Sequence, residues 1–79
     1  MPTDEPASVT ALDCTGLRCP MPIVRLGLAI RPLPAGARLE VRADDAAFEP
    51  DLRAWARQTG HAIVELEAGA VTRALVEKA

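Results

Sequence analysis

The chain has 79 residues, of which 49% are hydrophobic and 25% are charged, a balance that argues against a disordered or membrane-spanning protein. Folding at this size buries only about 60% of the surface of the unfolded chain, so the core is small and the functional site is expected at the surface. We predict one domain at residues 9–79, after a flexible polar tail at residues 1–8.

The charge pattern argues against nucleic acid as a direct partner. The net charge is -2, and the nine basic residues are scattered instead of forming a patch. Phe48 and Trp55 are the only aromatic residues, too few for the stacking platforms of single-strand binders. Arg25 interrupts the longest apolar run, and the first residues lack the basic and apolar regions of a signal peptide. We expect a cytoplasmic protein that binds neither nucleic acid nor membrane.

A strand, a helix and a second strand are predicted in the first half of the chain. Residues 9–13 are typical of a short strand, and a helix runs from Pro20 until Pro32 and Pro34 end it. The predicted buried stripe of this helix contains Ile23, Leu26, Gly27 and Ile30, widened by Val24 and Leu28. In residues 38–43 apolar and charged residues alternate, which predicts a strand that buries Leu39, Val41 and Ala43.

The next element is a helix that ends before Gly60, a residue suited to the left-handed position after a helix. Its predicted apolar face consists of Phe48, Leu52, Trp55, Ala56 and Thr59. Asp44 or Asp45 is expected to cap its start, a reading favoured over paired acid-base carboxylates. Pro50 is tolerated only in a first turn, so either Glu49 caps a late start or a short turn precedes the helix.

The last third of the chain predicts a hairpin. Ala62, Val64 and Leu66 alternate with His61, Ile63, Glu65 and Glu67, and we expect the first set to face the core. A second strand-like run covers residues 71–76. The element order β-α-β-α-β-β, with right-handed crossovers, predicts an α+β fold. It is a two-layer sandwich, in which two helices cover one face of a mixed four-stranded sheet. Charged residues of the strand at residues 38–43 lie on the outer face of the sheet, so we expect this face to be exposed to water. An exposed, charged face favours a monomer.

Cys19 is the candidate nucleophile. It stands at a strand-to-helix junction before Pro20, which suits the first helical position because it has no N–H to leave unpaired. We expect Cys19 to be the N-cap, with Met21 N–H as the one donor to its sulfur because Pro22 has none. The helix dipole and the cation of Arg18 should lower the thiol pKa and favour the thiolate. The alternative is a cysteine that merely fills the corner between strand and helix.

Cys14, five positions earlier, is interpreted as a core residue or an incidental half-exposed thiol, although a resolving or disulfide role stays open. Two cysteines are few for a disulfide-stapled domain, and in a reducing compartment thiols with a chemical role are the better explanation. A metal site needs about four ligands, and His61 is distant from both cysteines, so no metal and no cofactor is expected. His61 is interpreted as a surface residue and Trp55 as core.

Residues 12–22, Leu-Asp-Cys-Thr-Gly-Leu-Arg-Cys-Pro-Met-Pro, resemble the signature Leu-Asp-X-X-Gly-Leu-X-Cys-Pro-X-Pro of the TusA/SirA-like sulfur-carrier family. Gly16, Pro20 and Pro22 match fixed positions of the signature, whereas Arg18 and Met21 occupy variable ones. We expect all five residues to support Cys19. Residues 43–45, 51–55 and 59–61 are also similar to the second-helix region of that family. The resemblance therefore covers nearly everything from Leu12 to the C-terminus.

The resemblance implies a sulfurtransferase-type carrier with the same β-α-β-α-β-β sandwich. Cys19 would receive sulfane sulfur from a cysteine desulfurase or rhodanese-type donor, hold it as a persulfide, and pass it to an acceptor protein. The family serves tRNA thiolation, molybdenum-cofactor synthesis, sulfur oxidation or selenium metabolism, and the motif does not separate these. Whether the chain turns over thiosulfate unaided, as an enzyme in its own right, stays open. Cys14 occupies a variable position of the signature.

Two other classes of function compete with the carrier. One is a thiol-based redox or regulatory module that uses Cys19 and Cys14, which requires the two Cα atoms to lie within about 7 Å. The other is an RNA-binding domain, since the same element order occurs in translation factors; the missing basic patch counts against it. Arg18 and Arg25 are expected either to steer acidic partner surfaces or to be solvated charges.

Overall fold

Six elements follow one another in the predicted order β-α-β-α-β-β. The computed structural model describes residues 9–79, so the tail predicted at residues 1–8 lies outside the described residues. The elements are β1 (Thr10–Asp13), α1 (Met21–Ile30), β2 (Arg38–Ala43), α2 (Phe48–Thr59), β3 (Ala62–Glu67) and β4 (Thr72–Glu77). Neither of the two helices in this part of the chain is long and apolar enough to cross a bilayer.

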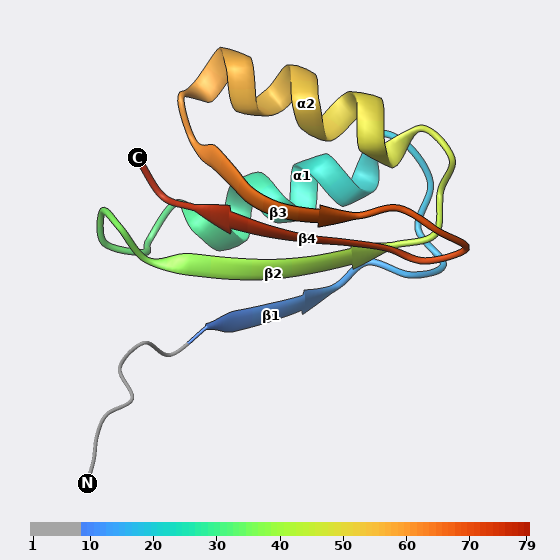
Figure 1. The fold of residues 1–79 in the computed structure, drawn as a ribbon, viewed down its shortest axis with the longest axis horizontal. Coiled ribbons are helices and arrows are strands. Elements are labelled where there is room, and N and C mark those ends of the chain that lie inside the picture. Colours follow the sequence, from blue (N-terminus) through green and yellow to red (C-terminus); the bar gives the residue numbers. More distant parts are fainter. Residues whose placement is uncertain (1–8) are drawn as a thin grey trace, which may run out of the picture.

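The four strands form one mixed sheet in the order β1-β2-β4-β3, and both helices cover the same face of it (Figure 1). β1 and β2 are parallel, whereas β4 is antiparallel to both β2 and β3. The predicted α+β sandwich is therefore confirmed. Because β1 and β2 run side by side in the same direction, the loops that follow them leave the sheet at the same edge. This edge is where the site described below is assembled.

The core lies between the sheet and the two helices. Leu39, Val41 and Ala43 of β2 are fully buried, as predicted, and pack with α1 and α2 residues that are also buried: Leu26, Ile30, Phe48, Leu52 and Trp55. Burying a leucine-sized side chain stabilises the fold by about 1.5–3 kcal/mol. Trp55 is 9% exposed and belongs to this core, which confirms its assignment.

The buried stripe of α1 is narrower than predicted. Pro22, Leu26 and Ile30 form its buried row at intervals of four residues, whereas Val24 is 44% and Leu28 57% exposed. Two residues correspond to about 200° around a helix, so Val24 and Leu28 point away from the row that contacts the sheet. The prediction that they widen the buried face was wrong.

The start of α2 also differs from the expectation. Its N-cap is Ala47, which makes no side-chain cap hydrogen bond, so Asp44, Asp45 and Glu49 are not caps. A turn at residues 46–47 precedes the helix, and Pro50 is the third helical residue, within the first turn where it is tolerated.

The end of α2 is close to the prediction. Gly60 follows the helix in the left-handed conformation with a φ of 84°, and its N–H donates to the Ala56 carbonyl. Thr59 is not part of the buried face, because it is exposed and its hydroxyl donates to the Trp55 carbonyl at 2.7 Å.

A bulge in β3 reverses the predicted faces of that strand. The pairing with β4 shifts register between Ile63 and Glu65, which leaves Val64 39% exposed. Ile63 and Leu66 pack against the core instead. Since side chains alternate with period two, one extra residue moves every earlier side chain to the other face. The predicted buried set of Ala62, Val64 and Leu66 was therefore right only for Leu66.

The outer face of the sheet is charged, as predicted for a wet surface. Arg73 of β4 lies at its centre and pairs with Glu40, Glu65 and Glu67, at 2.8–3.1 Å. These contacts raise the pKa of Arg73, and the guanidinium in turn lowers the pKa of Glu67. One guanidinium on β4 thus pairs with carboxylates of both neighbouring strands, β2 and β3.

Candidate functional site

The site is the loop between β1 and α1, residues 14–20, here called the cysteine loop. Its first residue continues the parallel pairing, because Cys14 N–H donates to the Arg42 carbonyl at 2.7 Å. Gly16 then turns the chain with a φ of 84°, a conformation that disfavours other residues. At the end of the loop Cys19 is exposed, and the Cys19–Pro20 peptide bond is cis.

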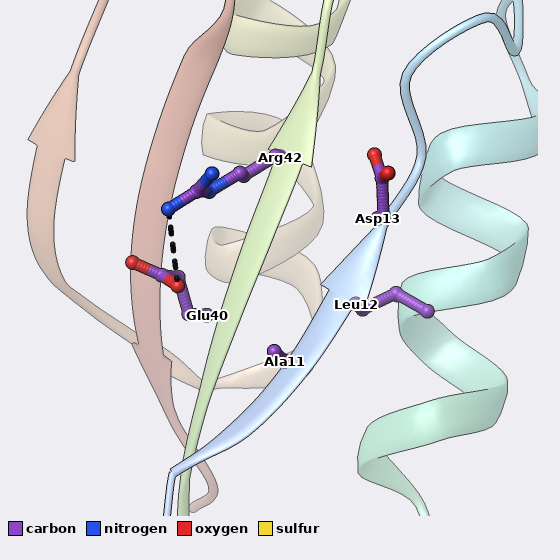
Figure 2. Close-up of a pocket in the computed structure, with 5 residues that line it drawn as sticks. All are labelled: Ala11, Leu12, Asp13, Glu40 and Arg42. Carbon is purple, nitrogen blue, oxygen red and sulfur yellow. Dashed lines mark ion pairs between the residues drawn. The ribbon is translucent and has the colours of Figure 1, made fainter.

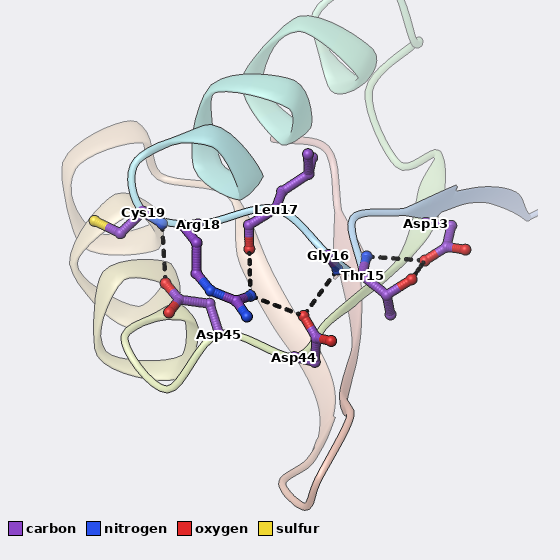
Figure 3. A network of polar contacts seen from close by, with 8 residues as sticks. All are labelled: Asp13, Thr15, Gly16, Leu17, Arg18, Cys19, Asp44 and Asp45. Atoms are coloured by element: carbon purple, nitrogen blue, oxygen red, sulfur yellow. Dashed lines mark hydrogen bonds and ion pairs between the residues drawn. The ribbon is translucent and has the colours of Figure 1, made fainter.

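Two neighbouring carboxylates of the loop after β2 hold the cysteine loop in place (Figure 3). Asp44 accepts the backbone N–H of Gly16 at 2.9 Å and forms an ion pair with the Arg18 guanidinium at 3.4 Å. Asp45 accepts the backbone N–H of Cys19 at 3.0 Å. The Gly16 hydrogen bond, followed by the Arg18 charge, lowers the pKa of Asp44. Both carboxylates thus act on the cysteine loop and not on α2.

Cys19 does not cap α1. The N-cap residue is Pro20, no side chain caps the helix, and Met21 N–H donates to the Arg18 carbonyl at 2.8 Å. Pro22, not Pro20, is the proline inside the first helical turn. The expectation that Met21 N–H holds the sulfur was wrong, because a backbone carbonyl three residues back satisfies that donor.

The Cys19 sulfur contacts a carboxylate of the second helix. Its thiol donates to Asp51 Oδ2, with a sulfur-to-oxygen distance of 3.0 Å. A carboxylate that accepts from a thiol stabilises the protonated form, so this hydrogen bond raises the pKa of Cys19; partial desolvation and the negative charges of Asp51 and Asp45 act in the same direction. The predicted lowering of this pKa was wrong. Arg18, expected to favour the thiolate, is instead engaged by Asp44.

A groove of about 250 Å³ opens beside the sulfur, between the start of α1 and α2. Cys19 lies at its border, and the other lining residues are Pro20, Ile23, Asp51, Ala54, Trp55 and Gln58. The walls are apolar apart from Asp51 and Gln58. A reactant can therefore reach Cys19 from an open surface, with no need to enter an enclosed cavity.

The other cysteine, Cys14, is a core residue. Its side chain is fully buried, 4.0 Å from the Pro22 carbonyl, and burial raises the pKa of its thiol. This confirms the core interpretation. Both cysteines are free thiols, one buried and one exposed.

The remaining motif residues take different positions around Cys19. Gly16 and Arg18 are bound by Asp44, and Pro20 lines the groove. Met21 is 40% exposed on the first turn of α1, whereas Pro22 is buried beneath the loop. The structure thus brings Gly16, Arg18 and Pro20 into the loop's surface and uses Pro22 to anchor the helix to the core.

His61 is not part of the site. Its ring lies 5.1 Å from the Trp55 ring, and its Nδ1 accepts the backbone N–H of Ala79 at 2.9 Å. It is half-buried, so it is less exposed than the surface residue that we predicted. Within residues 9–79 no three His, Cys, Asp or Glu side chains are grouped to hold a metal ion.

A second hollow, of about 330 Å³, lies along β1 and β2 (Figure 2). Ala11, Asp13, Glu40 and Arg42 line it, and Leu12 turns its side chain toward α1. Arg42 and Glu40 pair with each other at 3.8 Å. The hollow is lined by charged side chains and by no thiol, so it offers no chemistry comparable to that of Cys19.

Asp51 is the site residue that the sequence reasoning missed. It precedes the buried Leu52 in the first turn of α2, where an acidic residue is ordinarily explained by the helix dipole. The signal that points to it is topological. Since the loops after parallel neighbours β1 and β2 meet at one edge, the start of α2 must lie beside Cys19.

Comparisons with known proteins agree with this geometry. A model of the TusA sulfurtransferase family matches residues 10–78. The putative sulfur carrier protein YrkF of Bacillus subtilis is 44% identical over 68 residues, which are 85% of this chain and 37% of YrkF. YrkI of the same organism, also a putative sulfur carrier protein, is 48% identical over 54 residues, 68% of this chain and 72% of YrkI.

The sulfur carrier protein TusA of Allochromatium vinosum is 39% identical over 54 residues, 68% of this chain and 71% of that protein. The chain thus spans well under half of YrkF but most of the two shorter relatives. Among solved structures, a SirA-like protein of Desulfitobacterium hafniense has a TM-score of 0.74 at 23% identity, covering 89% of this chain and 96% of that one, and shows the same fold. The chain therefore belongs to the TusA sulfurtransferase family, the family that residues 12–22 predicted.

Proposed function

We propose that this protein is a sulfur carrier that holds sulfane sulfur as a persulfide on Cys19. The observation that carries the proposal is the exposed thiol of Cys19 on a loop fixed by Asp44 and Asp45. Its relatives' names, sulfur carrier protein, support the same role. A thiol that is already held in position can react with several partners without ordering a loop at each encounter.

Two displacements at sulfur account for the transfer. The Cys19 thiolate attacks the outer sulfur of a donor persulfide, and the donor leaves as a thiolate that takes up a proton. An acceptor thiolate later attacks the outer sulfur of the Cys19 persulfide, and Cys19 leaves as a thiolate. Each step exchanges one S–S bond for another, so no external oxidant or reductant is needed. The open groove beside Cys19 leaves room for both approaches.

The site residues have supporting roles in this proposal. Gly16 and Arg18 fix the loop through a hydrogen bond and an ion pair with Asp44. Pro20 lines the groove, and Met21 and Pro22 are the first residues of α1. We propose that residues 9–79 form a single carrier domain. We also propose that the protein acts as a monomer, because the outer face of the sheet is charged.

The donor is proposed to be a cysteine desulfurase or a rhodanese-type protein, and the acceptor a protein of tRNA thiolation, molybdenum-cofactor synthesis or sulfur oxidation. A nucleophilic free thiol requires a reducing compartment, so we assign the relay to the cytoplasm. The full burial of Cys14 favours the carrier over a two-thiol redox module, because a buried thiol is a poor resolving group.

The test is the intact mass of the reduced protein after incubation with a cysteine desulfurase and cysteine. We expect a gain of one sulfur atom in the wild type and in Cys14→Ala, and none in Cys19→Ser. A second arm replaces the desulfurase with thiosulfate alone and shows whether the chain takes sulfur unaided. No gain from the desulfurase, or a gain that persists in Cys19→Ser, would sink the proposal.

A further inference from the structure

In the part of the chain that the structure describes, the carboxylate that contacts the Cys19 sulfur forms no ion pair. Within residues 9–79, the ion pairs engage Asp44 and the glutamates at positions 40, 49, 65, 67 and 77. Asp51 is absent from these pairs, although its Oδ2 lies 3.0 Å from the sulfur and its side chain lines the groove. Asp45, whose Oδ2 accepts the Cys19 N–H, is also absent from these ion pairs.

We infer that Asp51 selects the sulfur donors that react with Cys19: it holds the resting residue as a thiol, favours donors with a positive charge beside the reactive sulfur, and disfavours anionic donors. The inference rests on the proposed function and names the donor class of that same site. Free thiosulfate and polysulfide are anions and belong to the disfavoured class. A protein donor with a Lys or Arg beside its persulfide belongs to the favoured class.

The charges that face the sulfur support this selection. Asp51 comes from α2 and Asp45 from the loop after β2, and both are negative. Arg18 is the nearest cation on the cysteine loop itself, and its guanidinium is turned to Asp44 and to the Leu17 carbonyl. Figure 3 shows this guanidinium on the Asp44 side of the loop, with the Cys19 sulfur pointing away from it. An approaching donor therefore meets negative charge first.

The contact between Asp51 and the Cys19 sulfur also explains how the thiol loses its proton when a donor binds. When a donor's cation pairs with Asp51, the carboxylate no longer stabilises the S–H bond, and the proton leaves to solvent. The Cys19 thiolate then forms a bond to the outer sulfur of the donor, while the donor's S–S bond breaks and its inner sulfur departs as a thiolate that takes up a proton. The sulfur atom changes carrier, and no net oxidation occurs.

Small disulfides of different charge test this selection without any sulfur donor. The probes are cystamine, which is cationic, hydroxyethyl disulfide, which is neutral, and dithiodiglycolate, which is anionic. Each rate of mixed-disulfide formation is measured by intact mass and divided by the rate of the same probe with 2-mercaptoethanol. Cys19→Ser identifies the reacting residue, because Cys14 is buried.

In the wild type we expect cystamine to react fastest and dithiodiglycolate slowest, with about threefold between successive probes, the effect of one unit charge about 6 Å away in water. Two ratios of normalised rates are compared: cystamine to hydroxyethyl disulfide, and hydroxyethyl disulfide to dithiodiglycolate. In Asp51→Asn both ratios should fall by at least half, and Asp51→Glu should restore part of each. Glu49→Gln is the matched control, since it removes a carboxylate from the same turn of α2 but one that pairs with Arg53. It should leave both ratios unchanged.

The pH dependence of Cys19 alkylation provides a second measurement, which would not change if the role of Asp51 were purely structural. The rate with iodoacetamide, a neutral reagent, should be higher in Asp51→Asn at neutral pH, because the carboxylate that raises the Cys19 pKa is gone. The difference in rate should vanish at a pH above the Cys19 pKa of both the wild type and the variant, because the Cys19 thiol is then fully ionised in each protein. Glu49→Gln should follow the wild-type profile.

Equal normalised rates for the three probes in the wild type would overturn the inference, whether or not any variant folds. So would an Asp51→Asn protein whose ratios and iodoacetamide profile match the wild type. Both results are independent of sulfur loading by a desulfurase. Failure of the selection and failure of the carrier function are therefore distinguished.

Discussion

Replacing Cys14 separates the buried thiol from the exposed one. The side chain is fully buried among core residues, and its sulfur lies 4.0 Å from the Pro22 carbonyl oxygen. Cys14→Ala removes one buried heavy atom, which should cost about 1 kcal/mol, close to the value of a buried methylene. Cys14→Ser buries a hydroxyl with a poorly placed acceptor and should cost about 1–3 kcal/mol.

Urea unfolding, followed by the fluorescence of Trp55, measures these losses, and the slope m should not change. For a domain of this size, each kcal/mol corresponds to a Tm lower by about 4–8 °C. Cys19→Ser is the surface control and should unfold close to the wild type. If Cys14→Ser were as stable as the wild type while Cys19→Ser lost stability, the assignment of the buried and exposed thiols would be refuted.

Two further predictions concern charged side chains. Asp44→Asn should lower Tm by a few degrees at neutral pH, because the pKa of Asp44 is depressed in the folded protein. This contribution is complete above the ordinary aspartate pKa of 3.8 and is lost as the pH falls further, through the lower folded pKa, so the Tm values of the variant and the wild type should converge only at a pH below that folded pKa. A gap that persists there in thermal melts would contradict the assignment. Arg73→Met leaves Glu40, Glu65 and Glu67 without their shared cation, so Tm should fall at low salt and recover part of the loss in 1 M salt, the screening expected at roughly a 3 Å Debye length. A loss that is independent of salt would argue for packing instead.

The order of the elements was predictable because the hydrophobic periodicity agrees with the positions of the glycines and prolines that end helices and strands along most of the chain. The alternation in residues 38–43 and the left-handed Gly60 place β2 and the end of α2 correctly. The faces of β3 were not predictable from alternation, since the bulge at Val64 is set by pairing with β4. The exposure of Val24 and Leu28 likewise depends on which arc of α1 meets the sheet.

The exposure of the Cys19 thiol was predictable, but the groups around its sulfur were not. Local reasoning placed Cys19 in the field of its own helix and Arg18, and so predicted a lowered pKa. The contact that raises it comes from Asp51, 32 residues away in the chain, and the Asp44 contact that engages Arg18 spans 26 residues. Such contacts follow from the parallel pairing of β1 and β2, which a one-dimensional pattern does not contain.

The most direct measurement locates the sulfur on the protein itself. The protein is purified without reductant, its persulfides are alkylated, and the digested peptides are sequenced by tandem mass spectrometry. The account predicts an additional sulfur atom on the peptide that contains Cys19, with Cys14 recovered as an unmodified thiol. An additional sulfur on Cys14, or on neither cysteine after incubation with a desulfurase and cysteine, would contradict it.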